Sequence, residues 1–447
     1  MVEAAAGPGR GIVRRIYANL GLLVGGKAAA GLISLAYMMI AARSLGPTDY
    51  GVLILMHGYA MAVGGIIEFP GWHAIVRYGA HAVEQSDEAR LVRLLRFAGG
   101  IEAVGGVCSV VAAIILAPII GPRLGWSATA QAFAIPYSLA VLASIRATPA
   151  GYLQLAGRFD MLGAHNVVSP AVRMLGAVLA ALTHAGLVGF LIAWLVAALA
   201  EWIVMWAMGF WVARKNLKGH AIFGRSRGAV QDNPGIWRFM VAANADITFT
   251  ELSGRIVPLI IGWVMGPAPA GLYALAQRAV VVIQQPAQIL GQAAYAEFAR
   301  LAASRVSGAV LRKALRQCIV TALLVALPIM LLMTFLSRPI AIFMGGERFA
   351  DAAGLIGCLA AARLILIMAP PISSALVALG RPGWSVGVNV AVVTICLPFL
   401  PVLLWNFGLP GAGILAEMQA VVTASLLCLL LLRATSESRP SVALSRR

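Results

Sequence analysis

The chain has 447 residues, of which 61% are hydrophobic and 11% are charged, and its mean hydropathy is +0.88. A water-soluble domain has too little interior to bury this share of apolar side chains, so the composition excludes that class of protein. The formal net charge of +17 would suggest a nucleic-acid partner for a soluble protein. In a membrane protein, the positions of the basic residues decide what that charge means.

Apolar segments that are long enough to cross a bilayer recur along the whole chain. A membrane-spanning helix needs roughly 20 mainly apolar residues. The first segment is longer than the core of a signal peptide and contains Lys27, so we interpret it as a retained helix. The sequence therefore predicts an all-α polytopic membrane protein with about twelve transmembrane helices, at 17–42, 51–69, 97–120, 128–150, 163–183, 186–211, 237–265, 270–294, 314–336, 352–379, 384–405 and 409–432.

Two breaks between these helices have related sequences. LGPTDYG follows the first helix at Leu45–Gly51, and MGPAPAGLY follows the seventh helix at Met265–Tyr273. A glycine followed by proline ends a helix, because glycine adopts the left-handed cap and proline cannot continue the hydrogen-bond ladder. A second pair of related turns, at Gly157-Arg158 and Gly380-Arg381, has nearly the same offset in the chain. Matched breaks at one offset predict two halves with the same plan.

We expect these halves to form two six-helix lobes. Because six is an even number, both lobes have the same orientation in the membrane, which predicts a relating axis along the membrane normal. The expected division is an N-terminal lobe at 1–213, a cytoplasmic linker loop at 214–236, a C-terminal lobe at 237–433 and a cytoplasmic tail at 434–447.

Most lysines and arginines fall on one side of the membrane in this assignment. Cytoplasmic loops of membrane proteins carry an excess of basic residues. The sequence therefore predicts that both termini are cytoplasmic, and no nucleic-acid partner is needed to explain the charge. The basic side holds Arg10, Arg14, Arg15, the cluster of Arg90, Arg93 and Arg96, the 214–227 loop, the 300–316 loop and the C-terminal arginines.

The sequence contains no motif of a catalytic or metal-binding site. The histidines lack a His-Glu-x-x-His spacing, and no Gly-x-Ser-x-Gly, P-loop or dinucleotide-binding pattern occurs. The five cysteines are single residues inside apolar spans, which is typical of small hydrophobic side chains. No loop is long enough to fold into a catalytic domain. We therefore expect neither enzymatic activity nor a metal or cofactor.

The breaks resemble those of a known transporter family. The segment Arg43–Gly51, the GPAPAGLYALAQR run at 266–278 and the LGR turn at Leu379–Arg381 resemble the polysaccharide-transport branch of the multidrug/oligosaccharidyl-lipid/polysaccharide flippase superfamily, which includes the O-antigen flippases. The resemblance extends over nearly the whole chain in helix number, half-and-half layout and loop lengths.

This resemblance implies a lipid-linked oligosaccharide as the substrate. Members export a polyprenyl-pyrophosphate-linked oligosaccharide from the cytoplasmic to the periplasmic leaflet of the bacterial inner membrane, by alternating access between two lobes. The product serves surface polysaccharides such as lipopolysaccharide or exopolysaccharide. The implied partners besides membrane lipids are a polysaccharide polymerase and a chain-length regulator. Whether protons or sodium ions are coupled to transport is left open.

Polar side chains along two helices predict a hydrophilic path through the membrane. Their spacing places each group on one helix face. Amide side chains offer donors and an acceptor that match sugar hydroxyls, although hydrogen bonding between helices of one lobe is the alternative for the glutamines. The seventh helix contributes Asn244, Thr248, Glu251 and Arg255, and the eighth contributes Arg278, Gln285, Gln288 and Gln292.

Charged side chains at membrane depth are costly and by default functional. We interpret five of them, drawn from both lobes, as candidates for binding the pyrophosphate. The alternative for Arg255 is an ion pair with Glu251, four residues earlier on its helix. Arg146 is left out of this set, because its side chain can extend to the cytoplasmic interface. The candidate anion-binding residues are Lys27, Arg173, Arg255, Arg278 and Arg363.

A cation-coupled multidrug and toxic compound exporter of the same superfamily is the main alternative. Such exporters place carboxylates in their cavity and commonly carry an aspartate in the first helix. Here Lys27 is the only charged residue between Tyr17 and Ala42, which favours an anionic substrate.

Overall fold

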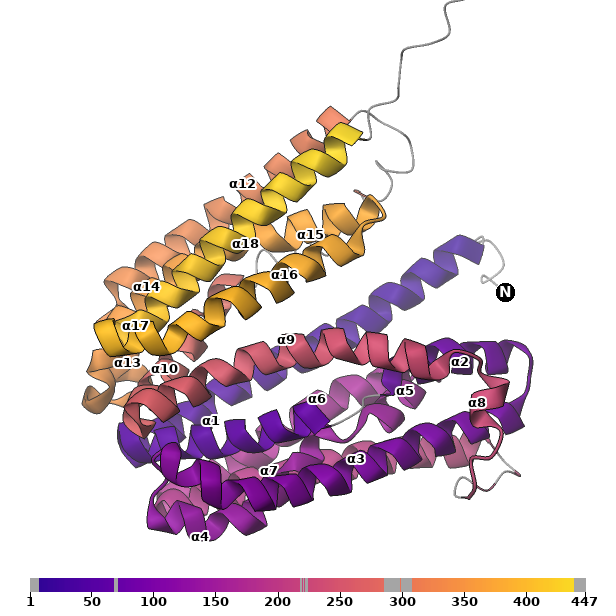
Figure 1. Ribbon diagram of the computed structural model, residues 1–447, viewed down its shortest axis with the longest axis horizontal. Coiled ribbons are helices and arrows are strands. Elements are labelled where there is room, and N and C mark those ends of the chain that lie inside the picture. The colour runs from indigo at the N-terminus through magenta and orange to yellow at the C-terminus, as the bar shows by residue number, and fades with distance from the viewer. Residues whose placement is uncertain are drawn as a thin grey trace, which may run out of the picture. The chain divides into compact units, whose positions relative to one another are not determined.

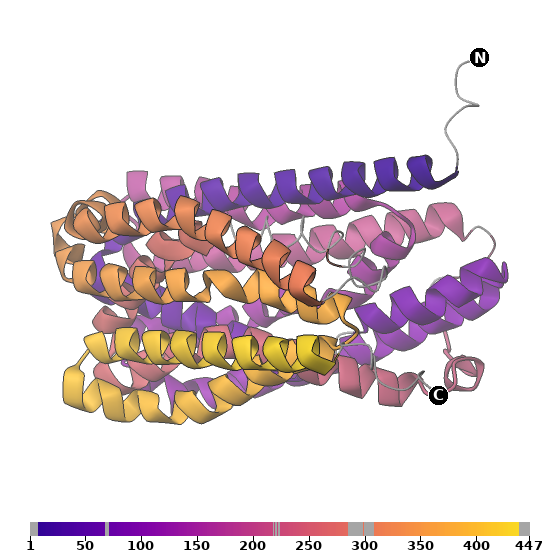
Figure 2. The same ribbon diagram turned by 90° about the horizontal axis from the view of Figure 1, so that it is seen from above.

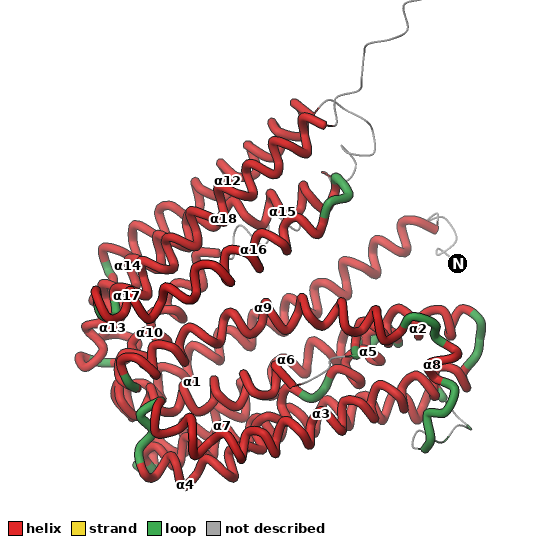
Figure 3. Tube along the Cα trace, in the orientation of Figure 1, coloured by secondary structure: helices red, strands yellow, loops and turns green. Residues whose placement is uncertain are grey.

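The structure is a computed structural model that describes residues 8–67, 71–217, 219, 221, 224–284, 298 and 308–437. For residues 8–24, 242–253, 282, 284, 308–309, 382 and 435–437, the description covers the backbone alone. Within the described residues the regular structure is helical and no strand occurs, which confirms the predicted all-α class (Figure 3). The chain separates into two compact units, and each is described by itself.

The first unit comprises Met1–Leu45 and Val52–Ile256 and is a bundle of long apolar helices (Figures 1 and 2). A lipid environment favours helices because every backbone polar group is then satisfied within its own segment. The elements that contribute to this unit are α1 (Pro8–Ile67), α2 (Trp72–Glu84), α3 (Glu88–Arg123), α4 (Ala128–Tyr137), the 3₁₀ helix η1 (Ser138–Ser144), α5 (Ala147–Leu155), α6 (Phe159–Leu182), α7 (Gly186–Asn216), α8 (Ala229–Asp232) and α9 (Ile236–Met265).

Helices α6 and α7 form an antiparallel pair and pack extensively against each other. A short turn joins them, in which His184 adopts a positive φ of 50°. A Cβ atom at Gly176 would lie 2.4 Å from the Cβ atom of Ala193, so the two backbones approach closely. Small residues allow this close packing where lipid provides no hydrophobic driving force.

The segment before α9 is attached to the end of α3. Arg93 Nε lies 2.6 Å from Asp232 Oδ2, and the Arg90 guanidinium donates to the buried side chain of Asn233 at 3.1 and 3.2 Å. The first turns of α9 bury Ile236 and Met240 against α2 and α3. Residues 236–256 therefore belong to the first unit by their contacts. The expected division instead placed the linker loop at 214–236 and began the C-terminal lobe at 237.

Helix α1 contains two of the predicted spans, joined by a kink. Gly46 has φ 72° and ψ 175°, and Pro47 follows it. The break therefore lies at the glycine as predicted and has the positive φ that favours glycine, but its ψ is extended and not that of a left-handed cap. The corresponding Gly266 has φ 89° and ψ −178°, immediately before Pro267 at the start of α10. The two related breaks therefore have nearly the same backbone conformation.

The two breaks also pack against each other, within the second unit. A Cβ atom at Gly51 would lie 1.8 Å from the carbonyl oxygen of Pro267, and one at Gly271 would lie 2.5 Å from the carbonyl oxygen of Pro47. Since each glycine faces the proline of the other break, the contact is reciprocal. This contact explains why each copy of the break has a second glycine five residues after the first, at Gly51 and Gly271.

The second unit comprises Gly46–Gly51 and Val257–Arg447. Its helix α14 packs between α12 and α18, and α13 and α17 are short helices at one end of it (Figure 1). Its further elements are α10 (Pro267–Val280), η2 (Val281–Gln284), α12 (Gly308–Phe335), α13 (Ser337–Gly345), η3 (Glu347–Ala352), α14 (Ala353–Ile365), η4 (Leu366–Met368), α15 (Ala369–Ala378), α16 (Pro382–Cys396), η5 (Leu397–Phe399), α17 (Leu400–Phe407) and α18 (Pro410–Glu437).

Nine segments of the described chain are long and apolar enough to cross a membrane. One of them, Gly25–Ile67, contains the first and second predicted spans, and the other eight coincide with spans three to six and nine to twelve. The seventh and eighth spans, 237–265 and 270–294, extend into residues outside the full description. Three spans that the sequence predicts as single helices are interrupted by 3₁₀ segments, at η1, η4 and η5. Pro136 lies two residues before η1, Pro370 lies two residues after η4, and Pro398 lies within η5.

Candidate functional site

A cavity of about 300 Å³ lies inside the first unit. Four helices and the break between η1 and α5 contribute to its lining, and the charged side chains are three arginines and one glutamate. The lining residues are His57, Gly58 and Met61 of α1, Ala143 and Ser144 of η1, Arg146 before α5, Arg173 of α6, Glu201 of α7 and Arg255 of α9.

Arg173 lies in the middle of α6 and is held by polar and aromatic contacts. Its Nη2 donates to Nε2 of His57 at 2.9 Å, and its Nη1 donates to the Tyr37 hydroxyl at 3.4 Å. The guanidinium carbon lies 5.5 Å from the ring centroid of Trp194. Delocalised guanidinium groups stack favourably on aromatic faces, so these contacts fix the cation at membrane depth.

The hydrogen bonds of His57 identify its tautomer. Because arginine has donors only, Nε2 of His57 must accept from Arg173, and the ring proton then lies on Nδ1. Nδ1 is 3.1 Å from the hydroxyl of Tyr137, to which it donates. The neutral imidazole of His57 therefore connects the hydroxyl of the buried Tyr137 to the Arg173 guanidinium through two hydrogen bonds, and it adds no charge to the cavity.

Arg146 reaches the cavity because the fourth predicted span is broken. Helix η1 ends at Ser144 and α5 begins at Ala147, where the backbone N–H groups of Ala147 and Thr148 donate to the buried carboxylate of Glu102 at 2.5 and 2.7 Å. A carboxylate at a helix N-terminus satisfies the free N–H groups there. This local capping turns the Arg146 side chain into the bundle, where it forms an ion pair with Glu201.

Glu201 is the one carboxylate that lines the cavity. Its side chain is largely buried on α7, and the carbonyl oxygen of the same residue accepts from Nε2 of the buried His165 at 2.9 Å. The expectation that Arg146 extends to the cytoplasmic interface is therefore wrong. The sequence offers an indication of this ion pair, because Arg146 and Glu201 are both isolated charges in apolar spans.

Arg255 enters the cavity from α9. Its Nη1 donates to the carbonyl oxygen of Met61 on α1 at 2.9 Å. The side chain of Glu251, its alternative partner, lies outside the described residues, as do the side chains of Asn244 and Thr248. The α9 backbone is helical through all four positions, so they share one face as the spacing predicts.

The other predicted site residues do not line this cavity. Lys27 is exposed on α1. In the second unit, Arg278 is exposed on α10 and Arg363 is half-buried on α14. Gln285, Gln288 and Gln292 lie outside the described residues. Of the five predicted cations, the structure thus brings together Arg173 and Arg255, and it adds Arg146.

This arrangement is suited to a multiply charged anion. With His57 neutral, three guanidinium groups and one carboxylate leave two excess positive charges in the cavity. Guanidinium groups donate in pairs to phosphate oxygens, and such charge-assisted hydrogen bonds are about twice as strong as neutral ones.

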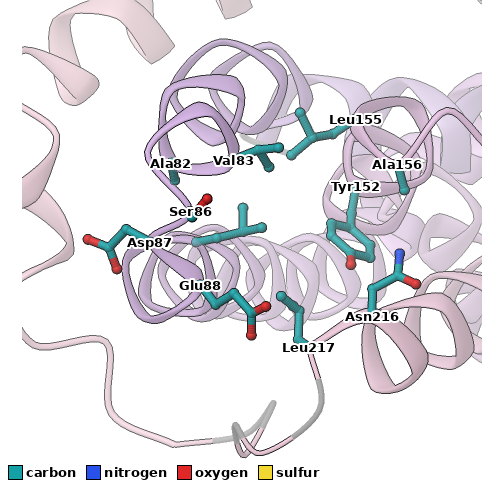
Figure 4. A pocket seen from close by; sticks show the side chains of 11 residues that line it. Ala82, Val83, Ser86, Asp87, Glu88, Tyr152, Leu155, Ala156, Asn216 and Leu217 are labelled. Carbon is teal, nitrogen blue, oxygen red and sulfur yellow. The ribbon is translucent and has the colours of Figure 1, made fainter.

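Another cavity of about 310 Å³ lies where the ends of α2, α5 and α7 meet the start of α3 (Figure 4). Glu88, Tyr152 and Asn216 line it, together with apolar side chains, while the Asp87 side chain points outward and accepts from the Arg90 N–H at 2.8 Å. Because its two charged residues are acidic, this cavity is unsuited to an anion.

Comparison with known proteins places this chain in a family. A family model described as "Polysaccharide biosynthesis protein" matches residues 40–354. The chain is 25% identical over 295 residues to the inner membrane protein YghQ of Escherichia coli (strain K12), which corresponds to 65% of this chain and 82% of that protein.

Two solved structures share the fold. An inward-facing multidrug resistance MATE family transporter of the MOP superfamily has a TM-score of 0.70 and 14% identity, covering 93% of this chain and 96% of that chain. The lipid II flippase MurJ in an inward closed conformation has a TM-score of 0.70 and 12% identity, covering 93% of this chain and 90% of that chain. These similarities confirm the predicted two-lobe transporter fold.

The comparisons also confirm the resemblance that the Gly-Pro breaks indicated. The family model covers well over half of the chain, and nine described segments are long and apolar enough to cross a membrane. The protein has the helices of a multi-pass membrane protein, and it belongs to the polysaccharide biosynthesis protein family.

Proposed function

We propose that this protein flips a polyprenyl-pyrophosphate-linked oligosaccharide from the cytoplasmic to the periplasmic leaflet, for surface polysaccharide synthesis, by alternating access between its two lobes. The observation that carries this proposal is the cavity in which Arg146, Arg173 and Arg255 meet. A diphosphate that enters a bundle of apolar helices loses its hydration, and only fixed cations and polar groups can replace it. The family description and the structural similarity to a lipid II flippase support a glycan-lipid substrate.

Glu201 has a defined role in this proposal. In the empty cavity it neutralises Arg146, which lowers the cost of burying that cation. An incoming diphosphate competes with the carboxylate for the same guanidinium. The site can therefore bind the anion without holding it so tightly that release becomes slow.

The membrane potential supplies a driving force in the proposed direction. Moving negative charge outward across an inside-negative membrane is downhill by roughly 2.3 kcal/mol per charge per 100 mV. Lys27, Arg278 and Arg363, with the polar faces of the seventh and eighth helices, are proposed as further contacts along the path. A polymerase and a chain-length regulator are proposed as the partners that use the exported glycan.

Deletion of the gene is expected to distinguish this function from drug export. Without the flippase, lipid-linked glycan should accumulate on the cytoplasmic leaflet and surface polysaccharide should fall, while efflux of cationic dyes is unchanged. The measurement is glycan-lipid extraction combined with a surface-polysaccharide assay and a dye-efflux assay. Lost efflux with normal polysaccharide would instead support a cation-coupled exporter, the activity named for the MATE relative.

The proposed orientation places both termini in the cytoplasm, which single-cysteine labelling can test. In a background without the five native cysteines, Gln85→Cys should be protected from an impermeant maleimide in intact cells. Ala128→Cys and Thr183→Cys should be labelled, because they lie at the opposite ends of α3 and α6 from the basic loops. All three positions are exposed. The reverse pattern would contradict the orientation.

A further inference from the structure

A groove between α3, α5 and α7 forms a separate cavity of about 370 Å³, within the range of roughly 300–1,000 Å³ that is typical of ligand pockets. It shares no lining residue with the arginine cavity. Its floor consists of small residues on α3 and α7, and its walls are aromatic. Its lining includes Arg96, Gly99, Gly100, Trp206, Phe210 and Gly224.

The groove opens onto an apolar surface. Gly100 is exposed, and a Cβ atom there would meet no other atom within 4 Å. Farther along α3, Val104 and Val107 are each 66% exposed, and on α7 Ile203 is 55% exposed. Contiguous exposed apolar side chains on membrane-spanning helices face hydrocarbon rather than water. A hydrocarbon chain can therefore pass from the surrounding surface into the groove.

The opposite end of the groove is basic. The Arg96 guanidinium donates to the carbonyl oxygens of Ala221 and Arg225, and a Cβ atom at Gly224 would lie 3.3 Å from its Cζ atom. Gly224 has φ 144°, a conformation that favours glycine, so the loop closes tightly over the guanidinium. This loop places the exposed Arg225 beside Arg96, and the exposed Arg214 lies at the end of α7.

We propose that this groove binds an anionic phospholipid of the surrounding bilayer, with an acyl chain on the Gly99–Gly100 floor and the phosphate at Arg96 and Arg225. An apolar groove that ends at cations matches the two chemistries of such a lipid, and basic residues attract the anionic lipids of the cytoplasmic leaflet. A water-soluble anion would gain nothing from the aromatic walls at Trp206 and Phe210. The site is independent of the transported substrate.

Photolabelling of the whole protein in nanodiscs tests this proposal. The probe is a phosphatidylglycerol with a diazirine in one acyl chain, and its attachment is mapped by mass spectrometry to peptides of α3 and α7. Gly100→Trp adds an indole to the groove at a position where the Cβ atom meets no other atom within 4 Å. It should reduce labelling of these peptides to background. Val111→Trp, on an exposed part of α3 that does not line the groove, should leave labelling unchanged.

The headgroup is tested separately. Arg96→Gln should lower phosphatidylglycerol labelling by about fivefold, because one basic contact is worth about 1 kcal/mol, and it should leave labelling by a phosphatidylcholine probe unchanged. Equal labelling by both lipids, or by wild type and Gly100→Trp, would overturn the proposal. Displacement of the probe by polyprenyl phosphate at lower concentration than by phosphatidylglycerol would also overturn it. The assay reads lipid binding alone, so its failure would leave the flippase proposal intact.

Discussion

Arg173→Ala is expected to reduce export of surface polysaccharide about tenfold or more, at normal protein levels in the membrane. Loss of one charge-assisted hydrogen bond to an anion costs about 1.5–3 kcal/mol, and 1.4 kcal/mol corresponds to a tenfold change in binding. Arg173 lies at membrane depth, lines the arginine cavity and is fixed by His57 and Trp194. The effect is measured as surface polysaccharide per unit of membrane-inserted protein.

Two companion variants separate charge from packing. Arg173→Lys keeps the charge but loses the planar donor fork, so we expect partial export. Arg255→Ala removes a second cavity cation, which donates to the carbonyl oxygen of Met61, and should also impair export. Arg214→Ala, at the exposed end of α7, is the matched control and should export normally. Full export by both Arg173→Ala and Arg255→Ala would mean that the phosphate is bound elsewhere.

Gly51→Ala is expected to lower the melting temperature of the purified protein by roughly 5 °C or more. The added methyl group would lie 1.8 Å from the carbonyl oxygen of Pro267, so backbone must move to accommodate it. Overpacking of this kind costs about 1–3 kcal/mol, and each kcal/mol shifts the midpoint by about 2–4 °C in domains of 150–250 residues. Gly271→Ala, which meets Pro47 in the same way, should have a similar effect.

The control for this prediction lies on the same helix. Gly31 is also in α1, and a Cβ atom there would meet nothing within 4 Å. Gly31→Ala should therefore leave the melting temperature unchanged or raise it slightly, since alanine favours a helix over glycine. If Gly51→Ala and Gly31→Ala melted at the same temperature, the close contact between the two Gly-Pro breaks would be refuted.

Much of the fold could be predicted from the sequence because membrane helices depend on one strong signal. A bilayer requires long apolar runs with internal hydrogen bonding, so hydropathy identifies them. The Gly-Pro pairs also predicted the kink at Gly46 and the start of α10, because the conformations of both residues are locally determined. That the two breaks contact each other required the structure.

The candidate site was only partly predictable, for a physical reason. Arg173 and Arg255 could be found because isolated cations in apolar helices are costly. Arg146 was assigned to the interface, since sequence alone does not reveal that Glu102 caps α5 and turns Arg146 inward. Lys27 satisfied the same sequence rule as Arg173 but is exposed on α1. Burial and direction depend on tertiary packing that hydropathy does not encode.

The most direct test of the proposed function is translocation in proteoliposomes with an inside-negative potential. A polyprenyl-diphosphate oligosaccharide is incorporated with a fluorescent label on its glycan, and accessibility to an impermeant quencher reports its leaflet over time. We expect wild-type protein to move the lipid to the outer leaflet faster than protein-free vesicles, and Arg173→Ala to match the protein-free rate. Equal rates for wild type, Arg173→Ala and empty vesicles, with uptake or release of a cationic dye by the wild type, would contradict the account.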